Sequence, residues 1–194
     1  MERNRAICAD MKIIAYLPNF LSFLRIVLSP LFALLFLSSS YDDQLLGVLI
    51  FTIAALTDTC DGYLARRWCV VTVYGAFLDP LADKLLIITG LACLWWQGII
   101  PWWLVTTIMA RDVLVTWLRK LAQRRRVAFV TSWNAKIKTV AQFVGLYVGF
   151  ATALWPCALF EQLTAVVMPL VTIITLYTGV EYGLQYALLQ RSIK

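Results

Sequence analysis

The sequence contains no histidine among its 194 residues. This absence removes the side chain that most often serves as a general base near neutral pH, and it excludes a phosphohistidine intermediate. If the chain moves a proton during catalysis, the acceptor is therefore expected to be a carboxylate. Aspartate and glutamate are scarce, with 11 in total, so the positions of these few carboxylates are informative.

The sequence also lacks any pattern of cysteines that indicates a disulfide framework or a metal-binding pair. Its five cysteines are Cys8, Cys60, Cys69, Cys93 and Cys157, and no two of them form a Cys-x-x-Cys pair. Their odd number and scattered positions predict free thiols that pack against apolar neighbours.

Charged residues are few: 14% of the chain is charged and 61% is hydrophobic, with a mean hydropathy of +0.78. These values exclude an ordinary soluble domain. Apolar runs of about 20 residues predict an all-α, polytopic integral membrane bundle of six transmembrane helices, forming one domain over residues 1–194. The predicted spans are 19–40, 44–66, 73–97, 99–121, 136–156 and 162–189.

The net charge of +6 is unevenly distributed between the predicted loops. The outer loops contain Asp42, Asp43 and Glu161 but no lysine or arginine. The inner segments hold the basic residues, including the run Arg124-Arg125-Arg126. Because basic residues collect on the cytoplasmic side, both termini and the loop near residue 70 are predicted to be cytoplasmic, in a bacterial-type inner or plasma membrane. We assign the basic charge to membrane topology and anionic lipid, and expect no nucleic-acid partner.

Residues 1–18 mix basic and apolar side chains before Pro18 and Asn19, and they predict a short interfacial helix on the cytoplasmic surface. A secretory signal is the alternative, but Arg25 interrupts the apolar region and no small-residue cleavage site follows. The sequence leaves open whether Met1 or Met11 is the start.

Four aspartates lie near the inner ends of the second and third predicted spans. Asp58 and Asp61 are three residues apart, and Asp79 and Asp83 are four apart, so each pair shares one face of its helix. If the chain reverses near residue 70, the two antiparallel helices bring all four carboxylates to similar depth. Buried acids are costly in a membrane, and an all-oxygen cage favours Mg²⁺ or Mn²⁺. The alternative is that these acids pair with nearby cations and take no part in chemistry.

The full pattern is Asp58-x2-Asp-Gly-x2-Ala-Arg-x8-Gly-x3-Asp-x3-Asp83. It resembles the signature of the CDP-alcohol phosphotransferase family of integral membrane enzymes, and every fixed position is matched. The resemblance implies two divalent ions held by the four aspartates, with Asp83 as the base that accepts the proton of the incoming alcohol. It also implies CDP-diacylglycerol as donor, CMP as leaving group and a homodimer.

The same resemblance assigns a second group of residues to the cytidine diphosphate. Small residues in the motif leave room for a ligand, and an arginine pairs with phosphate. The opening of the first span, Pro18-Asn19-x-x-Ser22-x-x-Arg25, also resembles the family pattern. A helix cap at Asn19 with Arg25 extending to the interface is the alternative there. The expected CDP-binding residues are Asn19, Ser22, Arg25, Gly62, Ala65, Arg66 and Gly75.

The acceptor is expected to meet cations from later spans. Two short motifs resemble those of the phosphatidylglycerophosphate synthases within the family. The first is Arg111-Asp112, where the synthases have Arg-Glu. The second is Ala135-Lys136-Ile-Lys138-Thr139, where they have Gly-Lys-x-Lys-Thr. Arg111, Lys136 and Lys138 would bind the phosphate of sn-glycerol 3-phosphate. The two lysines project about 200° apart on a helix, so only one is expected to face a cavity. Inositol phosphate and phosphatidylglycerol are the alternative acceptors.

Two other functional classes are also compatible with acidic residues in membrane-spanning helices. A divalent-cation transporter is one, although it favours ligands near the midplane with access from both sides. A noncatalytic scaffold is the other.

Overall fold

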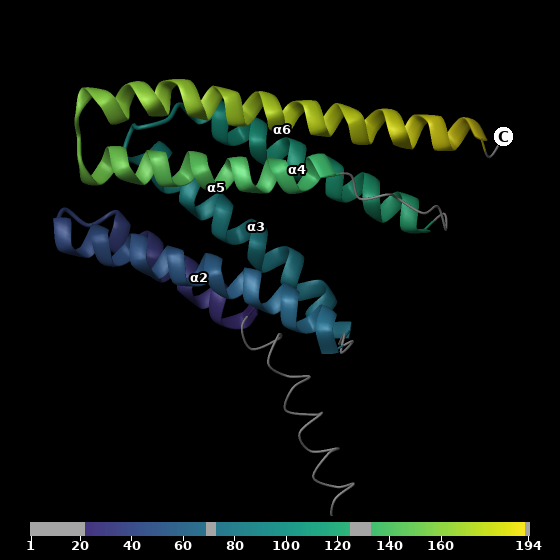
Figure 1. Ribbon diagram of the computed structural model, residues 1–194, viewed down its shortest axis with the longest axis horizontal. Helices are drawn as coiled ribbons and strands as arrows, with labels where there is room; N and C mark the ends of the chain where they lie inside the picture. The colour runs from purple at the N-terminus through teal and green to yellow at the C-terminus, as the bar shows by residue number, and fades with distance from the viewer. Residues whose placement is uncertain (1–21, 69–72, 125–132, 193–194) are drawn as a thin grey trace, which may run out of the picture. The chain divides into compact units, whose positions relative to one another are not determined.

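The computed structural model describes residues 22–68, 73–124 and 133–192, with side chains at 58–81, 83, 119, 123–124, 133–136 and 187–192 outside the description. All regular structure in these ranges is α-helical, which agrees with the predicted class (Figure 1). The predicted interfacial helix at 1–18 and Asn19 lie outside the described residues. The helices are Ser22–Phe36, α2 (Tyr41–Trp68), α3 (Val73–Trp96), α4 (Trp102–Arg124), α5 (Trp133–Leu154) and α6 (Ala158–Ser192).

Each described helix coincides with one predicted span, and the ends differ by no more than four residues. The turn after α3 illustrates what sets an end. Gly98 has a φ of 74°, a left-handed conformation that favours glycine. The amide of Gly98 donates to the carbonyl of Trp95 at 2.9 Å, and that of Ile99 donates to Leu94 at 3.0 Å. These bonds close the last turn of α3 as a C-cap.

Two helices among the described residues are long and apolar enough to cross a membrane, with candidate spans Ile137–Leu154 and Ala158–Tyr186. Ser22–Phe36 and Lys84–Trp96 are shorter apolar helical stretches. The structure thus contains six helices in the described ranges, while six membrane crossings remain a prediction.

The chain divides into two units, Met1–Cys93 and Leu94–Lys194. In the first unit, three fully buried phenylalanines join the helix Ser22–Phe36 to α2. The ring of Phe32 lies 5.3 Å from that of Phe36 and 5.1 Å from that of Phe51. A Cβ at Gly47 would lie 3.1 Å from the backbone nitrogen of Phe36. Glycine at this position therefore lets the two helices approach closely.

In the second unit, α6 packs against both α4 and α5. A turn at residues 155–157 joins α5 to α6, and the two helices run antiparallel and side by side (Figure 1). Gly145 of α5 faces α6, since a Cβ there would lie 3.0 Å from Met168 Sδ and 3.2 Å from a methyl group of Val171. This register of α5 against α6 fixes which polar residues lie level with one another.

The outward surface of the second unit is apolar. Side chains that are at least 60% exposed occur along all three of its long helices, at Val113, Val140, Val166, Ile173 and Val180. Soluble monomers rarely expose apolar surface on this scale. Such a surface is suited to contact with lipid hydrocarbon.

Candidate active site

The aspartate motif lies entirely on helical backbone. Asp58 and Asp61 belong to α2, and Asp79 and Asp83 belong to α3. Asp58 and Asp83 each lie ten residues from the helix end that borders the intervening segment 69–72. The reversal expected near residue 70 falls in this segment, which lies outside the described residues. The four carboxylates themselves, and therefore the predicted metal ligands and base, lie outside the described side chains.

The same limit applies to four of the predicted CDP-binding residues. Gly62, Ala65 and Arg66 lie on α2 and Gly75 lies on α3, with surroundings outside the description. The other two that are described, Ser22 and Arg25, are each 1% exposed. Arg25 is thus enclosed by the protein. This burial contradicts the helix-cap alternative, in which Arg25 would extend to the membrane interface.

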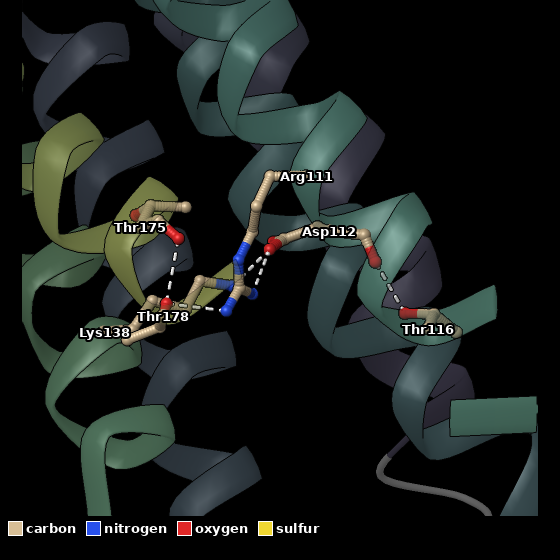
Figure 2. Close-up of polar contacts among 6 residues, drawn as sticks. All are labelled: Arg111, Asp112, Thr116, Lys138, Thr175 and Thr178. Carbon is tan, nitrogen blue, oxygen red and sulfur yellow. Dashed lines mark hydrogen bonds and ion pairs between the residues drawn. The ribbon is translucent and has the colours of Figure 1, made fainter. Parts of the chain in front are cut away.

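A second cluster of charged residues lies in the other unit, where α4, α5 and α6 meet (Figure 2). Asp112 accepts from both cations: Arg111 Nη1 lies 2.9 Å and Lys138 Nζ 2.5 Å from its Oδ1. Arg111 also donates through Nη2 to Thr178 Oγ1 of α6 at 2.6 Å. Arg111 and Asp112 of α4 thereby link Lys138 of α5 to Thr178 of α6.

Two features of α6 allow Arg111 to reach this position. Thr178 donates its own hydroxyl hydrogen to the carbonyl of Thr175 at 2.9 Å, so its oxygen is oriented to accept from Arg111. Gly179 clears the path, because a Cβ there would lie 2.9 Å from Arg111 Cγ and 3.2 Å from Nε. Any larger residue at 179 must displace the arginine side chain.

Positive charge is buried in this cluster. Two cations, Arg111 and Lys138, share one carboxylate, and the side chains of all three are at most 12% exposed. Arg111 Nε is buried and has no hydrogen-bond partner in the described part of the chain. Buried charge of this kind is costly unless it is paired. The arrangement is suited to binding an anion.

The structure describes one of the two lysines of the Ala135–Thr139 segment. Lys138 is buried and bonded to Asp112. Lys136 lies on the first turn of α5, and its side chain is outside the description. Lys138 thus shares the carboxylate of Asp112 with Arg111, and the prediction that one lysine of the two faces the acceptor stays a prediction.

Sequence reasoning missed Thr178 as a partner of Arg111. These two residues are 67 positions apart, and local patterns do not reveal such a contact. A signal did exist, because Thr172, Thr175 and Thr178 recur every third residue in an otherwise apolar part of α6. Threonines at this spacing lie near one another along one side of a helix.

Comparison with known proteins identifies the class. Residues 15–177 match the CDP-alcohol phosphatidyltransferase family, and the chain belongs to it. This is a family of membrane-embedded, metal-dependent enzymes, which excludes the scaffold and transporter alternatives.

Two relatives show how far the similarity extends. The chain is 38% identical to a probable phosphatidylglycerophosphate synthase of Mycobacterium tuberculosis (strain ATCC 25618 / H37Rv) over 172 residues, covering 87% of this chain and 80% of the relative. It is 34% identical to the CDP-diacylglycerol–glycerol-3-phosphate 3-phosphatidyltransferase of Escherichia coli (strain K12) over 174 residues, covering 86% and 92%.

Proposed function

We propose that this protein transfers the phosphatidyl group of CDP-diacylglycerol to sn-glycerol 3-phosphate, giving phosphatidylglycerophosphate and CMP. The names of the relatives support this reaction over most of the chain. The structural observation that carries the choice of acceptor is the buried cluster of Arg111, Asp112 and Lys138. An acceptor phosphate brings about two negative charges, and this cluster offers two buried cations and an Arg111 Nε that has no partner among the described residues.

The donor is assigned to the aspartate motif of α2 and α3. The donor set of Asp58, Asp61, Asp79 and Asp83 consists of carboxylate oxygens on helical backbone, which fits two Mg²⁺ or Mn²⁺ ions. When bound, such ions neutralise the diphosphate. Ser22, Arg25 and Arg66, with Asn19 and the small residues of the motif, would position the cytidine diphosphate.

The reaction forms one bond and breaks one. The primary hydroxyl oxygen of the acceptor bonds to the phosphorus that carries diacylglycerol, and the bond from this phosphorus to the bridging oxygen of CMP breaks. Asp83 accepts the hydroxyl proton. A carboxylate with an ordinary pKa is a weak base, so we expect positioning of the acceptor by Arg111 and Lys138 to supply much of the rate.

We also propose that all six helices cross the membrane, that both termini are cytoplasmic and that the enzyme is a homodimer. The absence of lysine and arginine from the predicted outer loops supports this orientation. A soluble acceptor phosphate is then met on the side where the basic residues collect.

The decisive experiment is a thin-layer assay of the purified protein with radiolabelled CDP-diacylglycerol and a panel of alcohols. We expect turnover with sn-glycerol 3-phosphate and CMP release in equal amount. Turnover with inositol phosphate or phosphatidylglycerol, and none with sn-glycerol 3-phosphate, would overturn the choice of acceptor.

A further inference from the structure

Two buried polar side chains in the second unit lack hydrogen-bond partners. Gln142 of α5 is 2% exposed, and neither its amide oxygen nor its amide nitrogen is bonded to a described residue. Thr175 of α6 is fully buried, and its hydroxyl oxygen is also without a partner in the described part of the chain. Buried polar groups are normally satisfied, and each exception carries a cost in stability.

The antiparallel register places these two residues level with each other. Thr152 Oγ1 lies 2.7 Å from Thr164 Oγ1, and Gly145 lies against Met168 and Val171. In this antiparallel pairing, each step back along α5 matches a step forward along α6. Gln142 of α5 therefore lies at about the same height as Thr175 of α6. The next turn brings Lys138 level with Thr178.

The pair therefore lies one helical turn from the cation cluster on both helices. Gln142 follows Lys138 by four residues, or about 6 Å along α5, and Thr175 precedes Thr178 by three residues on α6. Both steps lead in the same direction, toward the turn that joins α5 to α6. The interior between these helices thus has a charged layer and, next to it, a neutral layer of unbonded donors and acceptors.

The missing bonds are specific to this pair among the described hydroxyl and amide groups nearby. Thr172, on the same helix, donates to the carbonyl of Met168 at 2.9 Å, and Thr178 donates to Thr175. Gln142 and Thr175 together offer donors and acceptors but no charge. Their natural ligand is a neutral group that both donates and accepts, which describes an alcohol hydroxyl.

We propose that Gln142 and Thr175 form a subsite for the non-reacting secondary hydroxyl of the acceptor, whose phosphate is held by Arg111 and Lys138. This inference rests on the proposed function. A step of one helical turn is comparable to the length of a phosphorylated three-carbon chain. The phosphate and the reacting hydroxyl fix only two points of the acceptor, and a contact to the secondary hydroxyl adds the third point that distinguishes its two mirror images.

The test combines changes in the enzyme with changes in the substrate. The full-length protein and its Gln142→Met and Thr175→Val variants are assayed with sn-glycerol 3-phosphate and with 3-hydroxypropyl phosphate, which lacks only the secondary hydroxyl. Wild type should lose about tenfold in kcat/KM on the analogue, the worth of one or two neutral hydrogen bonds. Each variant should lose about tenfold in kcat/KM on sn-glycerol 3-phosphate. On the analogue, each variant should have nearly the same kcat/KM as wild type, because the interaction with the secondary hydroxyl is already absent.

Controls separate binding from a structural role. Thr172→Val removes a hydroxyl that is bonded within its own helix, and it should leave the acceptor constants unchanged. Gln142→Met and Thr175→Val should not lower the unfolding temperature, because each replaces an unbonded polar group with an apolar one of similar shape. Selectivity for sn-glycerol 3-phosphate over sn-glycerol 1-phosphate should fall in both variants, with the KM for CDP-diacylglycerol unchanged.

The outcomes are distinct. Equal losses on both acceptors, or no loss on either, would overturn the subsite while leaving the proposed function intact. Wild-type protein that ignores sn-glycerol 3-phosphate but turns over another alcohol would overturn the proposed function itself, and the subsite with it.

Discussion

Buried polar groups are hydrogen-bonded near the turn that joins α5 to α6, and several farther from this turn are left without partners among the described residues. Near the turn, Thr152 Oγ1 lies 2.7 Å from Thr164 Oγ1 and 3.1 Å from the carbonyls of Val148 and Phe160, so its bonding capacity is met inside the protein. At the other end, Arg111 Nε, the Gln142 amide and Thr175 Oγ1 are buried without partners in the described residues.

This difference separates a polar contact that holds the fold together from one that serves a ligand. A hydrogen bond closed within the protein contributes to stability and needs nothing from outside. Open donors and acceptors reduce stability and are retained where a ligand completes them. Substitutions at the closed end should therefore change stability, and those at the open end should change the constants for the acceptor.

The largest effect is expected outside this helix pair, at the aspartates. Asp58→Asn, Asp61→Asn, Asp79→Asn and Asp83→Asn should each reduce turnover by more than about 10²-fold, because each weakens the metal site or removes the base. The measurement is CMP release by purified protein at saturating acceptor. Near wild-type turnover by Asp83→Asn would show that this residue is not the base.

The open end should respond next most strongly, at Arg111. Arg111→Ala should raise the KM for sn-glycerol 3-phosphate by roughly 10–100-fold and leave that for CDP-diacylglycerol little changed, since it removes charge-assisted contacts to phosphate. Arg111→Lys should restore only part of the loss, because lysine lacks the guanidinium fork. Equal weakening of both substrates would instead assign Arg111 a structural role with Asp112.

A single methyl group at Gly179 should sharpen the comparison. Gly179→Ala places a Cβ 2.9 Å from Arg111 Cγ and should displace the arginine, raising the KM for the acceptor by about tenfold. Gly183→Ala is the matched control four residues further along α6, where an added Cβ meets nothing within 4 Å. Identical kinetics for the two variants would show that the position of Arg111 does not govern acceptor binding.

The smallest effect on catalysis is expected at the closed end. Thr164→Val removes the partner of Thr152 and should destabilise the protein by about 1 kcal/mol, with no change in either KM. Thermal unfolding in detergent, compared with that of Thr175→Val, provides the measurement. A changed acceptor KM in Thr164→Val would contradict the division between the two ends.

The helices and the aspartate motif are readable from the sequence because both are local. Apolar runs predict the six helices to within four residues of their observed ends, and the two aspartates of each pair, Asp58 with Asp61 and Asp79 with Asp83, lie on one helix as expected. Short motifs also drew attention to Arg111 and Lys138, which the structure places on the same carboxylate, while their role toward the acceptor stays a prediction.

The bonds of the cation cluster were not predictable in this way. Lys138 of α5 meets Asp112, and Thr178 of α6 accepts from Arg111, only because of how these helices are placed around α4. The two contacts join residues 26 and 67 positions apart. The same holds for Gly179, because the need for a position without a side chain appears only once Arg111 lies against it. Long-range packing carries this information, and a single sequence expresses it weakly.

The length of α6 gives a measure of depth. Its 35 residues span roughly 52 Å, well beyond the roughly 30 Å thickness of bilayer hydrocarbon. Thr178 lies twenty residues along the helix, or about 30 Å from its first residue. In the proposed orientation this distance places the Arg111 cluster at the boundary between acyl chains and headgroups. A water-soluble acceptor can then bring its doubly charged phosphate to Arg111 and Lys138 without carrying that charge into hydrocarbon, while a lipid partner stays anchored in its own leaflet.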